Sequence, residues 1–529
     1  MDIGTLSIIL LLGLFFLLAI GMPLGLASAT LACAVLVLKF GPDLLFRDFG
    51  RGPLAVVGQA IYRQMTNYVL ISVPLFIFMA ALLERTGIAK DMYSSLNVWL
   101  NRTRGGIAIV TSIMAVIMAA MSGIIGGEVV LLGLIALPQM LRLGYNQNLA
   151  IGTICASGTL GTMIPPSIVL IFYGLVTETS IKAMFTASFL PGFMLASFFI
   201  IYIIVRTRLN PDQAPLPEPD PADPGGTEKT VFFSAFLCLL AMGVVALLMV
   251  RILLIALVGN PVDADDPAFL AELSDLPYLA GLLAAGFFTL KFVFGVDRVR
   301  RGWELGKGLV GPIIVIGVVL GSIYGGITGI TEAAAMGVIA VFVIGVLRRE
   351  MSFDVLSDSL MRTMKSTGTI IWVTIGAASL ASAYTLVGGP TYVANLIVGA
   401  ELPTMGVILV MMAIFIVMGM FMDWVGIVLL IMPVFLPIVL KLPVDELGFL
   451  GGIDPKHVSI WFGVVFCMNM QVSFLSPPFG PAAFYLKSVA PPHISLTDIF
   501  RGFLPFISIQ LLALLVLLAW PNLVSVFLK

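Results

Sequence analysis

Charged side chains are scarce in this sequence. Only 11% of its 529 residues are Asp, Glu, Lys or Arg, against about 25% in an average soluble domain. Hydrophobic residues make up 60%, so most of the chain has no polar surface to present to water. The net charge is −1, which gives no reason to expect a nucleic-acid partner. The composition predicts a membrane protein surrounded by lipid.

Metal-binding and disulfide-forming residues are also scarce. The four cysteines stand singly in apolar runs, and the two histidines, His457 and His493, lie at the ends of segments. The chain contains no His-Glu-x-x-His sequence, which argues against an intramembrane metalloenzyme. We therefore expect no disulfide framework, no enzyme activity, and no cofactor other than coupling ions.

Apolar runs of about 20 residues, the length that crosses a bilayer, recur in two similar series. The first series, residues 1–205, has spans at 3–20, 23–40, 66–84 and 182–205, a re-entrant hairpin at 106–141 and a broken helix at 147–176. The second, residues 306–529, has spans at 309–325, 329–347, 367–387 and 500–524, a hairpin at 404–441 and a broken helix at 459–489. Between them, residues 206–305 form a proline-rich linker and two further spans, 229–258 and 277–295.

The number of crossings sets the relation between the two series. The first series crosses the membrane five times and the insert twice, so the second series enters from the opposite face. The sequence therefore predicts an all-α polytopic membrane protein of two inverted repeats, each with a re-entrant hairpin and a broken helix.

Basic residues indicate which face is cytoplasmic. Of the 28 Lys and Arg residues, 19 fall on one face in this arrangement. The opposite face carries both termini and an acidic loop of Asp263, Asp265, Asp266, Glu272 and Asp275. By the positive-inside rule the basic face is cytoplasmic, and both termini are periplasmic. The first hairpin then opens to the cytoplasm and the second to the outside.

Rare residues recur at fixed offsets in the two halves. Pro165-Pro166 is followed by Phe172-Tyr173, and Pro477-Pro478 is followed at the same spacing by Phe484-Tyr485. In the hairpins, an acidic residue precedes a proline by ten positions in both halves, as Glu128 and Asp423. Recurrence in the same order favours duplication over coincidence.

The two Pro-Pro pairs are expected to break their helices. Proline removes a backbone donor and clashes with the preceding turn, and such backbone is tolerated in a membrane only inside protein or beside a wet cavity. Hydroxyl and amide side chains gather at both breaks, and they offer neutral oxygens to sodium or hydrogen bonds to a substrate. The candidate substrate-binding residues are Ser157, Thr159, Ser167, Asn469 and Gln471. Half-helix N-termini suit an anionic group. The alternative is that these small and polar residues only kink or pack the helices.

Glu128 and Asp423 have two interpretations. A carboxylate within the membrane is by default functional, and these two could carry protons. Each could instead cap the helix that leaves its hairpin tip. The sequence leaves both interpretations open.

These motifs resemble those of the large membrane subunit of the tripartite ATP-independent periplasmic (TRAP) transporters. The resemblance covers both halves and rests on Gly21-Met22-Pro23, Ser122-Gly123, Gly161-Thr162-Met163-Ile164-Pro165-Pro166-Ser167, Phe421-Met422-Asp423 and Ser476-Pro477-Pro478. The long insert resembles the subgroup named for mannitol or chloroaromatic compounds, some relatives of which take 2-oxo acids.

The resemblance implies an elevator-type transporter in the bacterial inner membrane that imports an organic acid with sodium. It also implies a small four-helix membrane subunit and a periplasmic solute-binding protein as partners. The implied sodium-binding residues are Ser122, Gly123, Gly161, Ile164 and Pro166 at one site, and Gly419, Ser473, Ser476 and Phe479 at the other. A proton-coupled organic anion transporter or antiporter without a binding protein is the alternative.

Overall fold

The computed structural model describes residues 2–42, 44, 52–100, 102–217, 224–258, 273–399 and 401–528. All regular elements in these ranges are helices. Ten helical segments there are long and apolar enough to cross a membrane. The chain is therefore an all-α, multi-pass membrane protein, as the composition predicts. Linker positions 218–223 and the acidic residues Asp263, Asp265, Asp266 and Glu272 lie outside the described residues.

The described residues of the first half contain ten helices and two short 3-10 turns. They are α1 (Ile3–Ala19), α2 (Leu24–Phe40), α4 (Pro53–Met65), η1 (Tyr68–Ile71), α5 (Ser72–Arg85), α6 (Ile88–Leu100), α7 (Gly106–Ser122), α8 (Ile125–Arg142), α9 (Gln147–Gly158), η2 (Thr159–Thr162), α10 (Ile168–Thr177) and α11 (Ile181–Leu209). The helices α7 and α8 occupy the stretch expected to form the first hairpin. The break between α9 and α10 contains Pro165-Pro166, as expected.

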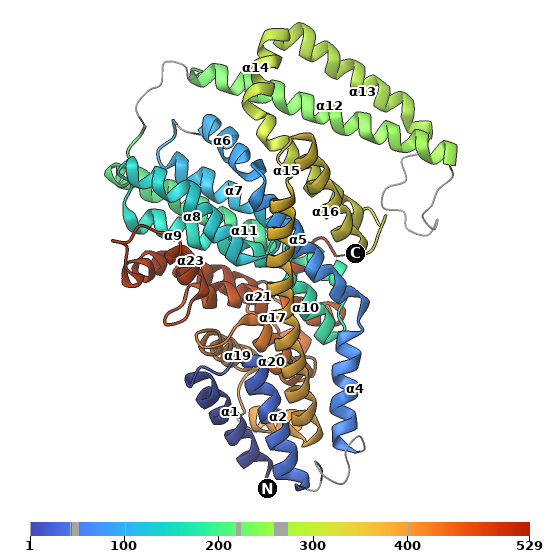
Figure 1. Ribbon diagram of the computed structural model, residues 1–529, viewed down its shortest axis with the longest axis vertical. Coiled ribbons are helices and arrows are strands. Elements are labelled where there is room, and N and C mark those ends of the chain that lie inside the picture. Colours follow the sequence, from blue (N-terminus) through green and yellow to red (C-terminus); the bar gives the residue numbers. More distant parts are fainter. Residues whose placement is uncertain are drawn as a thin grey trace.

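In the part of the insert that the structure describes, the chain forms two long helices and a short charged one. They are α12 (Gly226–Val258), α13 (Leu276–Phe288), which continues into a π-helical turn at Thr289–Phe294, and α14 (Val296–Gly306). In Figure 1, α12, α13 and α14 lie together at one end of the molecule, opposite the end that carries α1 and α2. Most side chains of α12 and α13 are exposed. These two apolar helices would meet lipid along most of their length.

The second half is also helical in its described residues. It contains α15 (Val310–Tyr324), α16 (Ile330–Leu347), α17 (Phe353–Leu386), α18 (Gly389–Val398), α19 (Thr404–Gly419), α20 (Trp424–Val439), α21 (Val458–Leu475), α22 (Pro481–Lys487) and α23 (Leu496–Ala519). The helices α19 and α20 occupy the expected second hairpin. The gap between α21 and α22 contains Pro477-Pro478.

The helices pack in two groups that position the site. In one group, the hairpins, α9, α10, α11, α21 and α23 contact one another. In the other, α17 packs against α2, α4 and α5, and α5 also packs against α16. Figure 1 shows α17 and α5 along the middle of the molecule, with α8, α9 and α23 to one side. The groups meet where α5 and α17 touch the hairpins.

Close helix contacts hold the second group together. A Cβ on Gly376 would lie 2.0 Å from the carbonyl oxygen of Gly25, so α2 and α17 approach backbone to backbone. Small residues permit this approach, which supplies packing where lipid gives no hydrophobic driving force.

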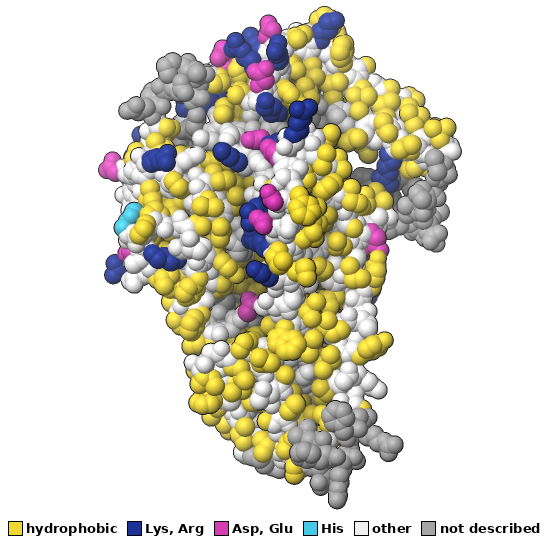
Figure 2. Space-filling view, viewed as in Figure 1, with side chains coloured by type: hydrophobic (Ala, Val, Ile, Leu, Met, Phe, Trp, Pro, Cys, Tyr) yellow, Lys and Arg dark blue, Asp and Glu magenta, His cyan; other side chains and the backbone are white. Residues whose placement is uncertain are grey.

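The surface agrees with a membrane setting. In Figure 2 hydrophobic side chains cover the lower part of the molecule, over α1, α2 and the lower part of α17. Charged side chains gather at the upper end near α14 and in a band down the middle. An apolar surface of this extent suits lipid and would be costly in water.

Candidate functional site

The tip of the first hairpin rests on the first helix break. Gly123, between α7 and α8, has φ of +63°, a conformation that glycine adopts without strain. A Cβ at this position would lie 2.3 Å from the carbonyl oxygen of Pro166. Glycine is therefore required for both the turn and the contact. The structure thus brings Ser122 and Gly123 next to Pro166, as the sequence predicts.

A buried carboxylate lies at the same place. Glu128, in the first turn of α8, is 1% exposed, and its Oε1 accepts a hydrogen bond from the Ser122 hydroxyl. A Cβ on Gly161 would lie 2.8 Å from this Oε1, so the carboxylate touches the turn before the break. Its Oε2 has no hydrogen-bond partner among the residues that the structure describes. Glu128 therefore presents an unpaired oxygen between the hairpin and the break, and its described hydrogen bond comes from Ser122, not from a helix amide.

The remaining residues of the first break are held by local hydrogen bonds. The Ser167 hydroxyl donates to the carbonyl oxygen of Thr162 at 2.6 Å and accepts from the N–H of Leu170 at 3.4 Å, which begins α10. The side chain of Ile164 packs against Gly192 of α11. Ser167 thus closes the break and caps the next half-helix.

The second hairpin approaches the second break in the same way. A Cβ on Gly419, the last residue of α19, would lie 2.2 Å from the Ser473 hydroxyl oxygen. Ser476 donates from its hydroxyl to the carbonyl oxygen of Val472 at 2.8 Å. Phe479 is exposed, and its ring centroid lies 6.4 Å from that of Phe421 at the hairpin tip. The four predicted residues of this site therefore lie at one junction.

Asp423 occupies the N-cap position of α20 in an extended conformation, with φ of −70° and ψ of 151°. Its carboxylate lies near the N–H groups of Trp424 and Val425, although no cap hydrogen bond forms. Unlike Glu128, Asp423 is exposed and lines a cavity. The two acidic residues therefore occupy different environments, despite their matching sequence positions.

The predicted substrate ligands are all fully buried, and those other than Ser167 tie the broken helices to their neighbours. Ser157 hydrogen-bonds Ser112 at 2.9 Å, and the Asn469 amide donates to the carbonyl oxygen of Met412 at 3.0 Å. Gln471 donates to the Thr162 hydroxyl at 2.6 Å, which joins the two breaks. Gln510 donates to the Thr159 hydroxyl at 3.4 Å. The cavities described below are lined by other residues.

A cavity of about 320 Å³, which we call the tip cavity, lies between the two hairpin tips. One wall is formed by residues 123–126, and another by residues 423–425. Its remaining walls come from both breaks and from the facing surfaces of α5 and α17. These further lining residues are Thr162, Ile168, Phe474, Pro481, Tyr485, Ile77, Ser366, Thr369 and Ile370. A cavity with apolar walls and a few polar groups suits a small molecule.

Sequence reasoning missed the aromatic and hydroxyl walls of the tip cavity. Tyr485 packs its ring on Gly126, where a Cβ would lie 3.0 Å from the ring carbon Cζ. The spacing of Phe484-Tyr485 after the second Pro-Pro pair was a usable signal for this residue. Ser366 belongs to α17, whose surface toward the hairpins depends on the packing of the two helix groups. The sequence carries no local signal for it.

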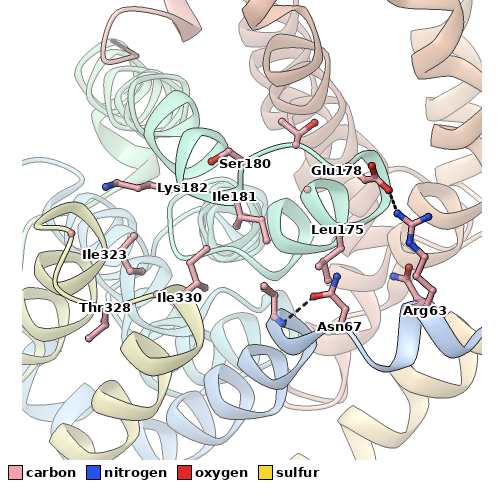
Figure 3. A pocket seen from close by; sticks show the side chains of 16 residues that line it. Arg63, Asn67, Leu175, Glu178, Ser180, Ile181, Lys182, Ile323, Thr328 and Ile330 are labelled. Carbon is pink, nitrogen blue, oxygen red and sulfur yellow. Dashed lines mark hydrogen bonds and ion pairs between the residues drawn. The ribbon is translucent and has the colours of Figure 1, made fainter. Parts of the chain in front are cut away.

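A larger cavity, of about 740 Å³, lies away from the breaks. Figure 3 shows that it opens between η1, the turn from α10 to α11 and the turn from α15 to α16. Arg63 and Glu178 form an ion pair at its edge, and both side chains are exposed. Asn67 accepts a hydrogen bond from the N–H of Val69 at 3.1 Å, which starts η1. The predicted site residues lie outside its lining, so this cavity is separate from the two hairpin–break junctions.

Known proteins resemble this chain over nearly its whole length. It is 26% identical to the C4-dicarboxylate TRAP transporter large permease protein DctM of Pseudomonas aeruginosa, over 94% of each chain. It is 26% identical to the 2,3-diketo-L-gulonate TRAP transporter large permease protein YiaN of Escherichia coli, over 97% of this chain and 96% of that protein. The ectoine/5-hydroxyectoine TRAP transporter large permease protein UehC of Ruegeria pomeroyi is 27% identical, over 92% and 91%.

A solved structure and a family model complete the comparison. The YdaH transporter of Alcanivorax borkumensis matches at 14% identity with a TM-score of 0.48, over 94% of this chain and 97% of that chain. The model of the tripartite ATP-independent periplasmic transporter, DctM component, matches residues 11–523. The chain therefore belongs to the DctM family, the large permease subunits of TRAP transporters.

Proposed function

We propose that this permease subunit imports a small organic acid with sodium, by an elevator movement of the hairpins and broken helices. The observation that carries the proposal is the seating of each hairpin tip on a helix break, with a cavity between the two tips. Ion and substrate would then be bound by adjoining parts of one packed group of helices. Such proximity couples the two binding events.

The residues of the first junction fit a sodium ion. They offer the free Oε2 of Glu128, the Ser122 hydroxyl and the carbonyl oxygen of Pro166, which lies against Gly123. A buried carboxylate oxygen without a partner is costly, and a bound cation would satisfy it. Sodium at this position would also neutralise the charge of Glu128.

The second junction offers neutral donors. The hydroxyls of Ser473 and Ser476 lie beside Gly419 and the break. A Cβ on Gly480 would lie 2.9 Å from the carbonyl oxygens of both Phe474 and Ser476, so these oxygens converge at the break. Unwound carbonyls and hydroxyls are the ligands that transporters use for sodium.

Partners and location follow from family membership and charge distribution. We propose that a small four-helix membrane subunit completes the scaffold and that a periplasmic solute-binding protein delivers the substrate. The chain would lie in the bacterial inner membrane with both termini periplasmic. Relatives are named for C4-dicarboxylates, 2,3-diketo-L-gulonate and ectoine. We propose a carboxylate substrate, with 2-oxo acids among the compounds to test first.

The test is uptake into proteoliposomes that contain the full chain and its two partner subunits. Uptake should require an inward sodium gradient and the binding protein, and it should stop when potassium replaces sodium outside. Uptake driven equally by a pH gradient without sodium would overturn sodium coupling.

Proton coupling is the second candidate, favoured by one observation. Glu128 is a buried carboxylate within the first hairpin and could bind a proton in place of sodium. The same proteoliposomes separate the two candidates. Proton coupling predicts that an inward proton gradient drives uptake when the sodium concentration is equal on both sides of the membrane. It also predicts that the lumen becomes more acidic as substrate enters.

A further inference from the structure

A second cavity, of about 200 Å³, adjoins the tip cavity. The two cavities share five lining residues, Ile77, Ile124, Gly126, Ser366 and Tyr485. The second cavity is also lined by Glu84 of α5, Arg362 of α17 and Gly127 of α8. We call it the α5–α17 cavity. This cavity continues the space beside the first hairpin tip as far as the oppositely charged side chains of Glu84 and Arg362.

Glu84 and Arg362 are held in this place by two contacts. Arg362 donates a hydrogen bond from Nη1 to Oε2 of Glu84 and forms an ion pair with it. The Glu84 side chain is only 13% exposed, whereas that of Arg362 is 44% exposed. A Cβ on Gly127 would lie 1.6 Å from Oε1 of Glu84, so the carboxylate rests directly on the first hairpin. Any side chain at Gly127 would displace it.

The charges around the two cavities are unequal. Among the described residues that line them, Arg362 is the only Lys or Arg, whereas Glu84 and Asp423 are both acidic. An organic anion that enters this space meets a single full positive charge. At low dielectric an unpaired anion is costly, so the anion needs that partner. The guanidinium can bind a carboxylate through two parallel hydrogen bonds.

We propose that Arg362 recognises the carboxylate of the transported molecule and that Glu84 is a competing carboxylate built into the chain. This inference rests on the proposed function, because it assigns the substrate's charged group to a residue beside the tip cavity. An entering carboxylate replaces Glu84 on the guanidinium, so Arg362 remains paired throughout the exchange. A neutral solute cannot make this exchange, which selects for acids.

The two residues then have opposite effects on an anion in the cavity. Glu84→Gln removes the competitor and leaves Arg362 available, so an anion should bind or react more readily. Arg362→Gln leaves Glu84 as an unpaired negative charge, so an anion should be repelled. If the ion pair only fastened α5 to α17, the expected result would differ. Loss of either partner would then loosen the same contact, and both substitutions would change the access of an anion in the same direction.

The test measures the local charge with a reagent of known charge. Ser366 lines both cavities and is replaced by cysteine in the full chain, with Cys33 and Cys238 changed to serine and the buried Cys155 and Cys467 retained. The probe is the anionic reagent sulfonatoethyl methanethiosulfonate, and the measured quantity is its rate of reaction in proteoliposomes. Relative to the Ser366→Cys parent, Glu84→Gln should raise the rate and Arg362→Gln should lower it, each by about fivefold or more.

Three controls and a second cysteine position accompany the measurement. The cationic trimethylammonium analogue should show the reverse order, and Arg362→Lys should stay near the parent rate because it keeps the charge. Arg63→Gln removes an exposed ion pair with Glu178, outside both cavities, and should leave the rate unchanged. Thr369→Cys, which lines the tip cavity, gives an independent second position.

The outcomes separate this inference from the proposed function. The reaction needs no sodium gradient, so sodium-independent uptake would overturn the coupling mechanism and leave the anion site standing. Shifts of the same sign for Glu84→Gln and Arg362→Gln, or unchanged rates at both cysteine positions, would overturn the anion site and leave sodium coupling untouched.

Discussion

At the scale of single residues, Gly123 combines two constraints that can be separated. It has φ of +63°, and a Cβ would lie 2.3 Å from the carbonyl oxygen of Pro166. Gly21 also has a positive φ, of +86°, but a Cβ there would meet nothing within 4 Å. We predict that Gly123→Ala lowers the free energy of unfolding by at least about 1 kcal/mol more than Gly21→Ala, since only Gly123→Ala adds a steric clash.

Thermal unfolding in detergent, followed by tryptophan fluorescence, measures this difference. Gly123→Ala should also reduce uptake, because the hairpin tip must lift from the break to make room for the methyl group. Equal melting temperatures for the two variants would show that the tip and the break are not in the contact described.

Glu128 gives a prediction about ion affinity. Glu128→Gln keeps the shape of the side chain but removes the charge that a bound sodium ion would neutralise. We predict that the sodium concentration for half-maximal uptake rises about tenfold, which corresponds to about 1.4 kcal/mol of binding free energy. The matched control is Glu178→Gln, because Glu178 is exposed and pairs with Arg63 away from the hairpins. Equal sodium dependence in the two variants would remove Glu128 from the ion site.

Sequence patterns predicted residues at the two hairpin–break junctions, but not most of those that line the tip cavity. Ser122 and Gly161 were implied by the resemblance to TRAP large subunits, whereas Ser473 and Ser476 also stand out as hydroxyls beside a proline pair, a local signal. Asn469 and Gln471 gave the same signal but are buried in contacts between helices. Whether a polar side chain points into a cavity or into a neighbouring helix depends on packing, which local sequence does not encode.

At the scale of elements, one charged cluster joins two helix connections. Arg348, which follows α16, donates to Asp91 of α6 at 2.5 Å and makes two hydrogen bonds of 3.0 Å to Glu350. Glu350 also accepts from the N–H of Gly87 at 3.0 Å. The Arg348 guanidinium holds the pKa of Glu350 below its ordinary value of 4.5. The cluster therefore fastens the connection between α5 and α6 to the connection between α16 and α17.

This cluster should make stability depend on pH. A depressed carboxyl pKa stabilises the fold above the ordinary value of 4.5, and this contribution is lost as the pH falls through the lowered pKa. We predict that Glu350→Gln destabilises the protein by about 0.5 kcal/mol at pH 7, a small value because the pair is partly exposed. The difference in stability between Glu350→Gln and the parent should disappear well below pH 4.5.

Melting temperatures of parent and variant across this range provide the measurement. The control is Asp445→Asn, which removes an exposed carboxyl group between α20 and α21. A gap between the parent and Glu350→Gln that persists at low pH would show that the change acts through packing and not through the charge.

The element with the largest departure from expectation is α17. The hydropathy pattern predicts a span that starts at residue 367, whereas the helix starts at Phe353. The added turns carry Asp358 and Arg362, which pair with Arg85 and Glu84 of α5. Charges satisfied by a neighbouring helix are invisible to a window that scores each residue alone. The amphipathic helices α4 and α6 were missed because a window that averages the hydropathy of all helix faces scores them as only weakly apolar.

At the scale of the whole molecule, strong apolar periodicity predicted most of the helices but not their grouping. The spans, the two hairpin segments and the two breaks follow from runs of apolar residues and from proline chemistry. The division into a group around α9, α21 and α23 and a group around α5 and α17 comes from contacts between distant segments. The elevator proposal depends on that division, because the movement would take place where α5 and α17 meet the hairpins.

Orientation in the membrane gives the last prediction, and it follows from where the basic residues lie. The helix α14 carries Arg298, Arg300 and Arg301, so it should face the cytoplasm, whereas the segment after α23 should face the periplasm. Both ends offer exposed positions for cysteine, Arg300 and Asn522. Each cysteine is introduced into a variant of the chain that lacks reactive native cysteines, and the variants are expressed in spheroplasts. A membrane-impermeant maleimide should label Asn522→Cys directly, and it should label Arg300→Cys only after the membrane is permeabilised. The reverse pattern would invert the assigned topology, and with it the faces to which the two hairpins open.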